Sequence, residues 1–125
     1  MIEPVIIVTN NPLSRDRFQT KHKVYFINGN VMDVLKMVRD YVHCGHKLLT
    51  HPLVGSVKPN QIPYRTILLS SDKKENVDFQ SLGYIEKSIY TTQKFIKNYD
   101  IPMWDSSVLN DFSVIDYDII KHVFE

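Results

Sequence analysis

Short, continuous apolar runs recur along the chain, each rich in β-branched or aromatic residues and bounded by polar turn residues. They occupy residues 5–8, 24–27, 47–50 and 66–69. Runs of this length and composition are typical of strands that are buried on both faces, and such strands favour a mostly parallel sheet. The pattern therefore predicts an α/β fold with a mostly parallel sheet of about four strands flanked by helices, in a Rossmann-like three-layer arrangement.

A helical period separates the second run from the third. Apolar side chains at Val31, Val34, Leu35, Val38 and Val42 share one face of a helix. We expect Asn30 to cap the start of this helix, Asp33 to interact with the helix dipole in the first turn, and Gly45 to end it. Residues 24–50 are then predicted to form a strand, helix, strand unit with a right-handed crossover.

Helical periodicity dominates the second half of the chain. Leu82, Ile85, Ile89 and Ile96 mark one apolar face, and Pro102 ends any helix before it. We expect Trp104 to pack as an anchor after that break. A last helix is predicted to begin at Ser113, with Asp116 completing a capping-box-like start, because Ile115, Ile119 and Val123 then lie on one side.

Polar residues follow all four predicted strands, at residues 9–11, 28–30, 50–52 and 70–72. In an open parallel sheet, ligands bind outside the carboxyl ends of the strands, so these four exits should meet at one edge. The proline-containing loop of residues 51–60 would be its largest wall. The pattern predicts a ligand-binding site composed of Asn10, Asn11, His51, Ser56, Lys58 and Asn60. The alternative for each Asn and Ser is an ordinary turn or cap residue.

Length and charge limit the function. A chain of 125 residues with 43% hydrophobic content is predicted to form one domain, residues 1–125. The net charge of +1 gives no reason to expect binding to nucleic acid or to an anionic membrane. A single cysteine, no signal-like segment and no membrane-spanning run favour a cytoplasmic protein. The oligomeric state stays open.

Motifs with a fixed chemistry are missing. The sequence contains no dinucleotide-binding, phosphate-binding-loop or nucleophile-elbow motif, so no cofactor is expected. His43, Cys44, His46 and His51 are residue types that zinc accepts. However, a strand between His46 and His51 would separate them by about 16 Å, which is too far for one ion, so no metal is expected. Cys44 is better explained as a small buried thiol than as a group for thiol exchange.

One stretch carries a family resemblance. "VRDYVHCGHKLLTHPLVGSVKPNQIPYRTILLS", preceded by "VTNNPL" and followed by "DFSVIDYDIIKHVF", resembles the GrdX family, small proteins associated with glycine, sarcosine and betaine reductase gene clusters. The resemblance implies a cytoplasmic protein in amino-acid fermentation, and it assigns no reaction and no catalytic residue.

Two functions remain open from the sequence. The first is an accessory protein that binds a small anionic metabolite or a glycine reductase component through residues 51–60. The alternative is an enzyme acting on such a metabolite, with His51 as general acid or base near Ser56 or Tyr64. Nothing in the spacing of these residues requires catalysis.

Overall fold

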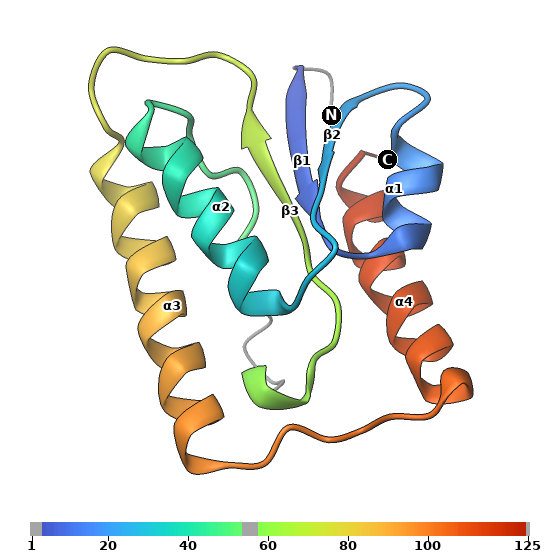
Figure 1. Cartoon of the computed structure of the whole chain (residues 1–125). Coiled ribbons are helices and arrows are strands. Elements are labelled where there is room, and N and C mark those ends of the chain that lie inside the picture. The colour runs from blue at the N-terminus through green and yellow to red at the C-terminus, as the bar shows by residue number, and fades with distance from the viewer. Residues whose placement is uncertain (1–3, 54–57, 125) are drawn as a thin grey trace.

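Three strands form the sheet at the centre of the molecule (Figure 1). The structure is a computed structural model, and it describes residues 4–53 and 58–124. The strands are β1 (Val5–Thr9), β2 (Lys23–Phe26) and β3 (Thr66–Ser70), in the order β2-β1-β3. β1 pairs with β2 in parallel and with β3 antiparallel, with Ile7 opposite Leu68. The sheet is therefore mixed and narrow.

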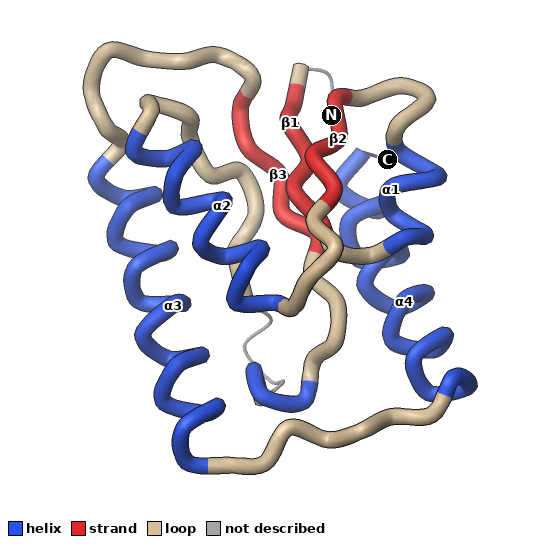
Figure 2. The backbone as a smooth tube through the Cα atoms, viewed as in Figure 1, coloured by secondary structure: helices blue, strands red, loops and turns tan. Residues whose placement is uncertain are grey.

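Helices cover both faces of this sheet (Figures 1 and 2). α2 and α3 lie on one side, and α1 and α4 lie on the other. Their bounds are Pro12–Phe18 for α1, Val31–His43 for α2, Phe79–Asn98 for α3 and Ser106–Lys121 for α4, with short 3-10 turns at Pro59–Gln61 and His122–Phe124. The predicted three-layer α/β arrangement is confirmed.

Alternate residues of β1 enter two separate hydrophobic clusters. Ile6 and Val8 pack with the buried side chains of α2 and α3, whereas Val5 and Ile7 pack with Phe18 of α1 and Ile120 of α4. Because successive side chains of a strand point to opposite faces, a strand covered on both sides must be apolar at every position. The continuous run "VIIV" meets that requirement.

The predicted signals around α2 are confirmed in detail. The Asn30 side chain accepts a hydrogen bond from Asp33 N, and the Asp33 carboxylate accepts one from Asn30 N, which completes a capping box. Gly45 follows the helix with φ at 106°, a conformation that favours glycine. The backbone of Gly45 also lies against Lys74, where an added Cβ would overlap the Lys74 carbonyl oxygen.

The predicted strand at 47–50 is wrong. Residues 47–50 contribute one isolated bridge, between Leu48 and Leu69. Two backbone hydrogen bonds still join the segment to β3, from Leu49 N to Leu68 O at 2.9 Å and from Ser70 N to Lys47 O at 2.8 Å. Beyond them side chains take over, because Thr50 Oγ1 accepts from Leu68 N and Ser81 Oγ accepts from Leu48 N. The strand, helix, strand unit predicted for residues 24–50 is consequently limited to its first strand and its helix.

The predicted four-stranded, mostly parallel, Rossmann-like sheet is also corrected. A continuous apolar run indicates burial on both faces but carries no information on strand direction, and β3 is antiparallel to β1. The Thr66 end of β3 therefore adjoins Thr9, and residues 70–72 lie at the opposite edge of the sheet from residues 9–11.

Two further expectations differ from the structure, and one helix was not predicted. α4 begins at Ser106 with Asp105 as its N-cap, so Ser113 lies inside the helix and does not start it. α1 was not predicted, because its seven residues are too few to show a period. Cys44 is exposed, not buried, and it lies at the C-cap of α2.

No helix in the described ranges is long and apolar enough to cross a membrane.

Candidate functional site

Asn10 lies at the carboxyl end of β1, where its side chain joins three loops. Its Nδ2 donates to Gly29 O at 3.0 Å and to Pro63 O at 2.9 Å, and its Oδ1 accepts from Arg65 N at 2.9 Å. Only 5% of the residue is exposed. The amide group of Asn10 thus fixes the backbone around this edge of the sheet.

Asn11 is fully buried and links α1 to α4. Its Oδ1 caps α1 by accepting from Leu13 N at 3.1 Å and also accepts from Ser113 Oγ at 2.8 Å. Its Nδ2 donates to Ser113 O at 2.9 Å and to Asp116 Oδ2 at 3.0 Å. All of the hydrogen-bonding groups of this side chain are used within the protein.

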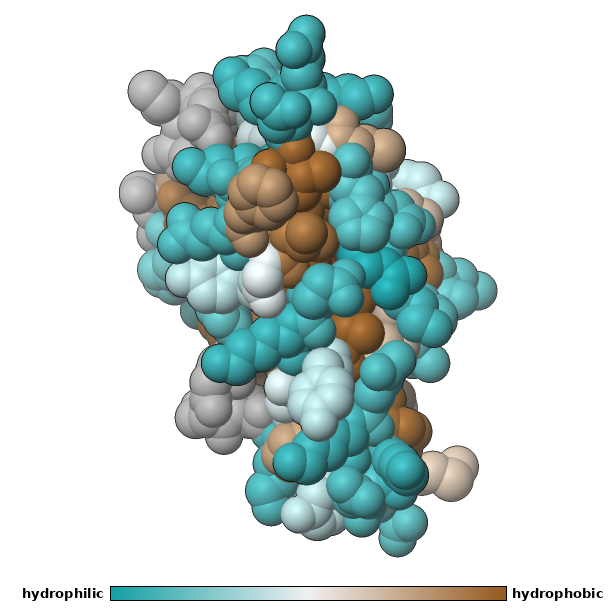
Figure 3. Space-filling model, turned by 90° about the vertical axis from the view of Figure 1, so that its left-hand side faces the viewer, coloured by the Kyte–Doolittle hydropathy of each residue, from teal (hydrophilic) through white to brown (hydrophobic). Residues whose placement is uncertain are grey.

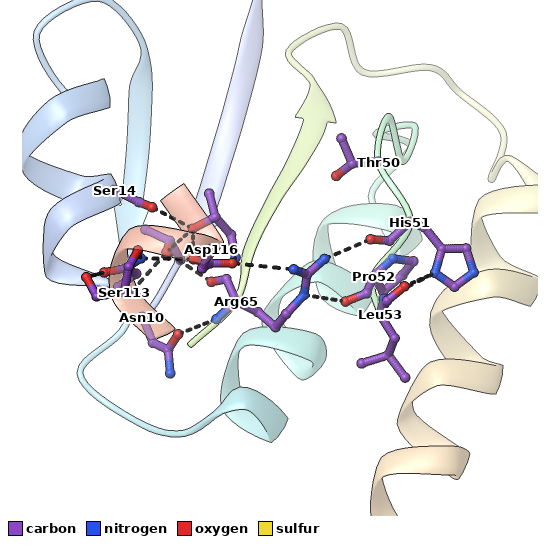
Figure 4. Close-up of polar contacts among 12 residues, drawn as sticks. Asn10, Ser14, Thr50, His51, Pro52, Leu53, Arg65, Ser113 and Asp116 are labelled. Atoms are coloured by element: carbon purple, nitrogen blue, oxygen red, sulfur yellow. Dashed lines mark hydrogen bonds and ion pairs between the residues drawn. The ribbon is translucent and has the colours of Figure 1, made fainter. Parts of the chain in front are cut away.

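Asp116 is the acceptor at the centre of this polar network (Figure 4). Besides Asn11, its carboxylate accepts from Thr66 N at 3.1 Å and from Thr66 Oγ1 at 2.6 Å. The Thr66 hydroxyl also lies 2.8 Å from Ser14 Oγ. The Asp116 side chain is 5% exposed. A buried carboxylate needs several donors to offset the loss of water, and these residues supply them.

Arg65 provides the countercharge and holds the following loop. Its Nη1 lies 3.4 Å from Asp116 Oδ1, Nε donates to Pro52 O at 2.8 Å, and Nη2 donates to His51 O at 3.0 Å (Figure 4). Burial lowers the pKa of the Arg65 guanidinium, while the Asp116 carboxylate raises it. The planar fork of arginine suits this set of partners, because it presents several N–H donors in a fixed geometry.

The His51 ring turns away from Asp116, toward α3 (Figure 4). Its Nδ1 lies 2.6 Å from Leu53 O and 3.2 Å from Leu53 N, and its ring packs at 5.4 Å from the ring of Tyr84. His51 and Tyr84 line a hollow of about 260 Å³ on the α3 side. Asn10 and His51 thus lie at one edge, joined through Arg65, but the His51 ring opens on a separate hollow.

The remaining predicted site residues are dispersed. Ser56 lies outside the described residues. Lys58 is exposed and precedes the 3-10 turn without capping it through its side chain. Asn60 is buried, and its Nδ2 donates to Asp100 O at 2.9 Å, while its Oδ1 has no partner in the part of the chain that the structure describes. The five predicted site residues within the described ranges do not share one of the hollows described above or below.

Two adjoining hollows open at the same edge of the sheet. The first, of about 160 Å³, is lined by apolar side chains of α4 and of the segment before β3, with Arg65 and Asp116 at its base. Its apolar walls are Ile62, Tyr64, Phe112, Ile115 and Ile119. The second, of about 210 Å³, lies between residues 60–63 and 101–104 and shares Ile62 with the first. These walls can accept apolar side chains.

The exit of β3 forms a different hollow, at the opposite edge of the sheet. Its volume is about 480 Å³, and its lining includes Lys47, Lys74, Asp72 and Asp78. Hydrogen bonds from the Ser81 hydroxyl and backbone lower the pKa of Asp78. Within the described ranges, no group of three His, Cys, Asp or Glu side chains is arranged to hold a metal ion.

Arg65 and Asp116 were missed by the sequence analysis, although they are the charged centre of the edge. A signal was present for each. Arg65 directly precedes the apolar run of β3, where a charge must be buried or paired. Asp116 lies four residues before the buried Ile120, on the inner face of α4. Placing the start of the helix at Ser113 hid this position.

Comparison with known proteins came to one result. A family model described as GrdX-like protein matches residues 6–125, nearly the whole chain. A search of curated proteins found no match, and a search of solved structures found none either.

Proposed function

Because this chain belongs to the GrdX-like family, we propose that it is an accessory protein of glycine reductase that binds a reductase component at the edge of the sheet beside α4. The observation that carries the proposal is the apolar hollow of about 160 Å³ whose base is the buried Arg65–Asp116 pair. A preformed apolar hollow with a few polar groups is the usual form of a binding site.

A protein component is better supported than a small anionic metabolite. Arg65 is the only cation lining the two adjoining hollows as described, and Asp116 already balances its charge. Lys58 is exposed and lines neither of them. An anion would therefore find little uncompensated positive charge there, whereas an apolar side chain of a partner would find matching walls.

The enzyme hypothesis has less support. A general acid or base must face the site that holds its substrate, and the His51 ring lines the hollow beside Tyr84, not the hollow above Arg65 and Asp116. Asn10 and Asn11, which were predicted to belong to the same site as His51, are occupied by internal hydrogen bonds. These contacts suit a scaffold that positions loops.

Binding of purified glycine reductase components to the immobilised protein tests the proposal. We expect one component to bind wild type and to bind Ile119→Asp at least about tenfold more weakly, since a charge placed at the mouth of the hollow must be desolvated. Tyr90→Asp, on the exposed side of α3, is the matched control and should bind like wild type. Absence of binding to every component would overturn the proposal.

The metabolite alternative is tested separately by thermal shift with glycine, betaine, phosphate and acetyl phosphate. We expect the melting temperature to stay unchanged with each compound, in wild type and in a His51→Ala, Lys58→Ala double variant alike. A shift that appears only in wild type would instead favour a metabolite bound through these two side chains.

A further inference from the structure

An exposed apolar surface runs from the α3–α4 connector onto the outward side of α4. Met103 in the connector is 99% exposed and Ile101 is 62% exposed, while Ile115 and Ile119 on α4 are 57% and 41% exposed. We call these four residues, together with Ile62, the docking face. Ile62 joins its two parts because it lines both adjoining hollows. Contiguous exposed apolar surface of this kind marks interaction sites.

The docking face is fixed by internal contacts. In the connector, which crosses from α3 to α4 in Figure 2, Trp104 Nε1 donates to Gln61 O at 3.0 Å, and the Trp104 ring packs at 5.6 Å from that of Phe112. Asp100 O accepts from Asn60 Nδ2 at 2.9 Å. These contacts hold the connector against the turn at Pro59–Gln61, so binding would require little ordering of the connector.

Charge is distributed unevenly along the chain, and four of the five docking-face residues lie in its acidic part. Residues 1–98 hold 14 basic and eight acidic side chains, whereas residues 99–125 hold one basic and six acidic ones. Two exposed carboxylates lie near Ile115 on α4. Asp111 precedes Ile115 by four residues, and Asp118 follows it by three. Residues at these spacings are neighbours on a helix surface, so two carboxylates flank the apolar side chains.

From this combination we infer that the docking face binds a basic amphipathic helix of a partner protein. The inference rests on the proposed function in assuming a protein partner, and it adds the partner's chemistry. Apolar side chains of the partner helix would enter the hollows beside Ile62. Its lysine or arginine side chains would pair with Asp111 and Asp118 at the rim, which favours association and selects against acidic partners.

A competing apolar surface lacks this charge pattern. On the side of the molecule that α3 faces, apolar atoms form a strip bordered by polar atoms (Figure 3). α3 exposes Phe79, Tyr84 and Tyr90, but its own charged residues are three lysines and one glutamate. Lysine thus outnumbers glutamate on α3, in contrast to the carboxylates beside Ile115, and this surface serves as the control region for the experiment.

The test is a fluorescence anisotropy titration of the full chain with a labelled leucine–lysine peptide at amphipathic-helix spacing. The same peptide with glutamate in place of lysine is the charge-reversed probe. We expect the lysine peptide to bind at least about tenfold more tightly than the glutamate peptide, with a preference that shrinks as the ionic strength rises from about 0.05 to about 0.5 M.

Two pairs of variants locate the binding. Two double variants should each weaken binding of the lysine peptide at least about fivefold. One combines Asp111→Asn with Asp118→Asn, and the other combines Met103→Ser with Ile115→Ser. Two matched double variants alter exposed residues elsewhere and should bind like wild type: Glu75→Gln with Glu86→Gln, and Phe79→Ser with Tyr90→Ser. Circular dichroism spectra that match wild type would show that each variant is folded.

Two results would overturn the inference. The first is equal binding by the docking-face variants and their controls. The second is a concentration-dependent dimer in sedimentation velocity that Ile115→Ser abolishes, because the face would then belong to a second copy of the chain. The proposed function fails separately: if the peptide binds at the docking face but no reductase component binds the protein, the chemistry of the face stands and the glycine reductase assignment falls.

Discussion

At the level of single residues, the Thr9 end of β1 and the Thr66 end of β3 surround a buried ion pair between Arg65 and Asp116. Asn10 and Asn11 follow β1 as recognised from the sequence, but their side chains bond to groups at Pro63, Arg65 and Asp116. These partners lie 53 to 105 residues away along the chain. Local patterns identify which residues are polar, and they carry no information on such distant partners.

Removing one member of the buried pair should be costly. Asp116→Asn leaves the Arg65 charge buried without its countercharge and weakens the acceptor for Thr66, so we expect the free energy of unfolding to fall by about 3–5 kcal/mol. Urea denaturation followed by circular dichroism measures this. Asp118→Asn, at an exposed position on the same helix, should change stability by less than about 0.5 kcal/mol.

The pair can also be replaced as a unit. In Arg65→Met with Asp116→Asn, both charges are absent, so the double variant should lose less stability than the two single variants lose together. A double-mutant cycle that finds the two positions independent would contradict the electrostatic role assigned to this pair.

At the scale of elements, periodicity and capping predicted most helices and strands, but not strand direction. α2 agrees with its predicted cap, face and terminating glycine, because each of these signals is local. β3 has the apolar run expected of a buried strand, yet it is antiparallel. Residues 47–50 have similar composition, yet they form only an isolated bridge to β3, between Leu48 and Leu69, and Leu48 N donates to the Ser81 side chain.

Two glycines provide a test of these local requirements. Gly83→Ala lies inside α3, where the new Cβ would meet no atom within 4 Å apart from its chain neighbours and the adjacent helix backbone, so it should raise the free energy of unfolding by about 0.5–1 kcal/mol. Gly45→Ala should lower it by more than about 1 kcal/mol, because φ is positive there and the Cβ would meet the Lys74 backbone. Equal effects in chemical denaturation would refute the assigned conformations.

The N-cap of α3 predicts a pH dependence. Hydrogen bonds from the Ser81 hydroxyl and backbone lower the pKa of Asp78 in the folded protein. A lowered folded pKa contributes stability above the unfolded value, near pH 3.9, and this stability is lost as the pH falls through the folded pKa. Wild type should therefore lose stability toward pH 2 faster than Asp78→Asn, measured by urea denaturation. If the stability of wild type and of Asp78→Asn changed in parallel with pH, the hydrogen bonds assigned between Asp78 and Ser81 would be contradicted.

At the scale of the whole molecule, the acidic final segment and its exposed apolar side chains set one end of the chain apart. The sequence alone predicted a binding site near residues 9–11 and 51–60. It did not anticipate that α4 would supply Asp116 and Ile119 to that edge, because the contact joins segments about 50 to 105 residues apart. The hollow forms where α4 packs beside the segment that precedes β3. No local sequence pattern encodes that contact.

The central claim is that a glycine reductase component binds beside α4, and hydrogen–deuterium exchange of the complex tests it most directly. Each purified component is added in excess to the full chain, and exchange is compared with that of the free protein. A component bound beside α4 should slow exchange at residues 101–105 and in the α4 segment around Ile115, and should leave α2 unchanged. Protection confined to α3, or no protection with any component, would contradict it.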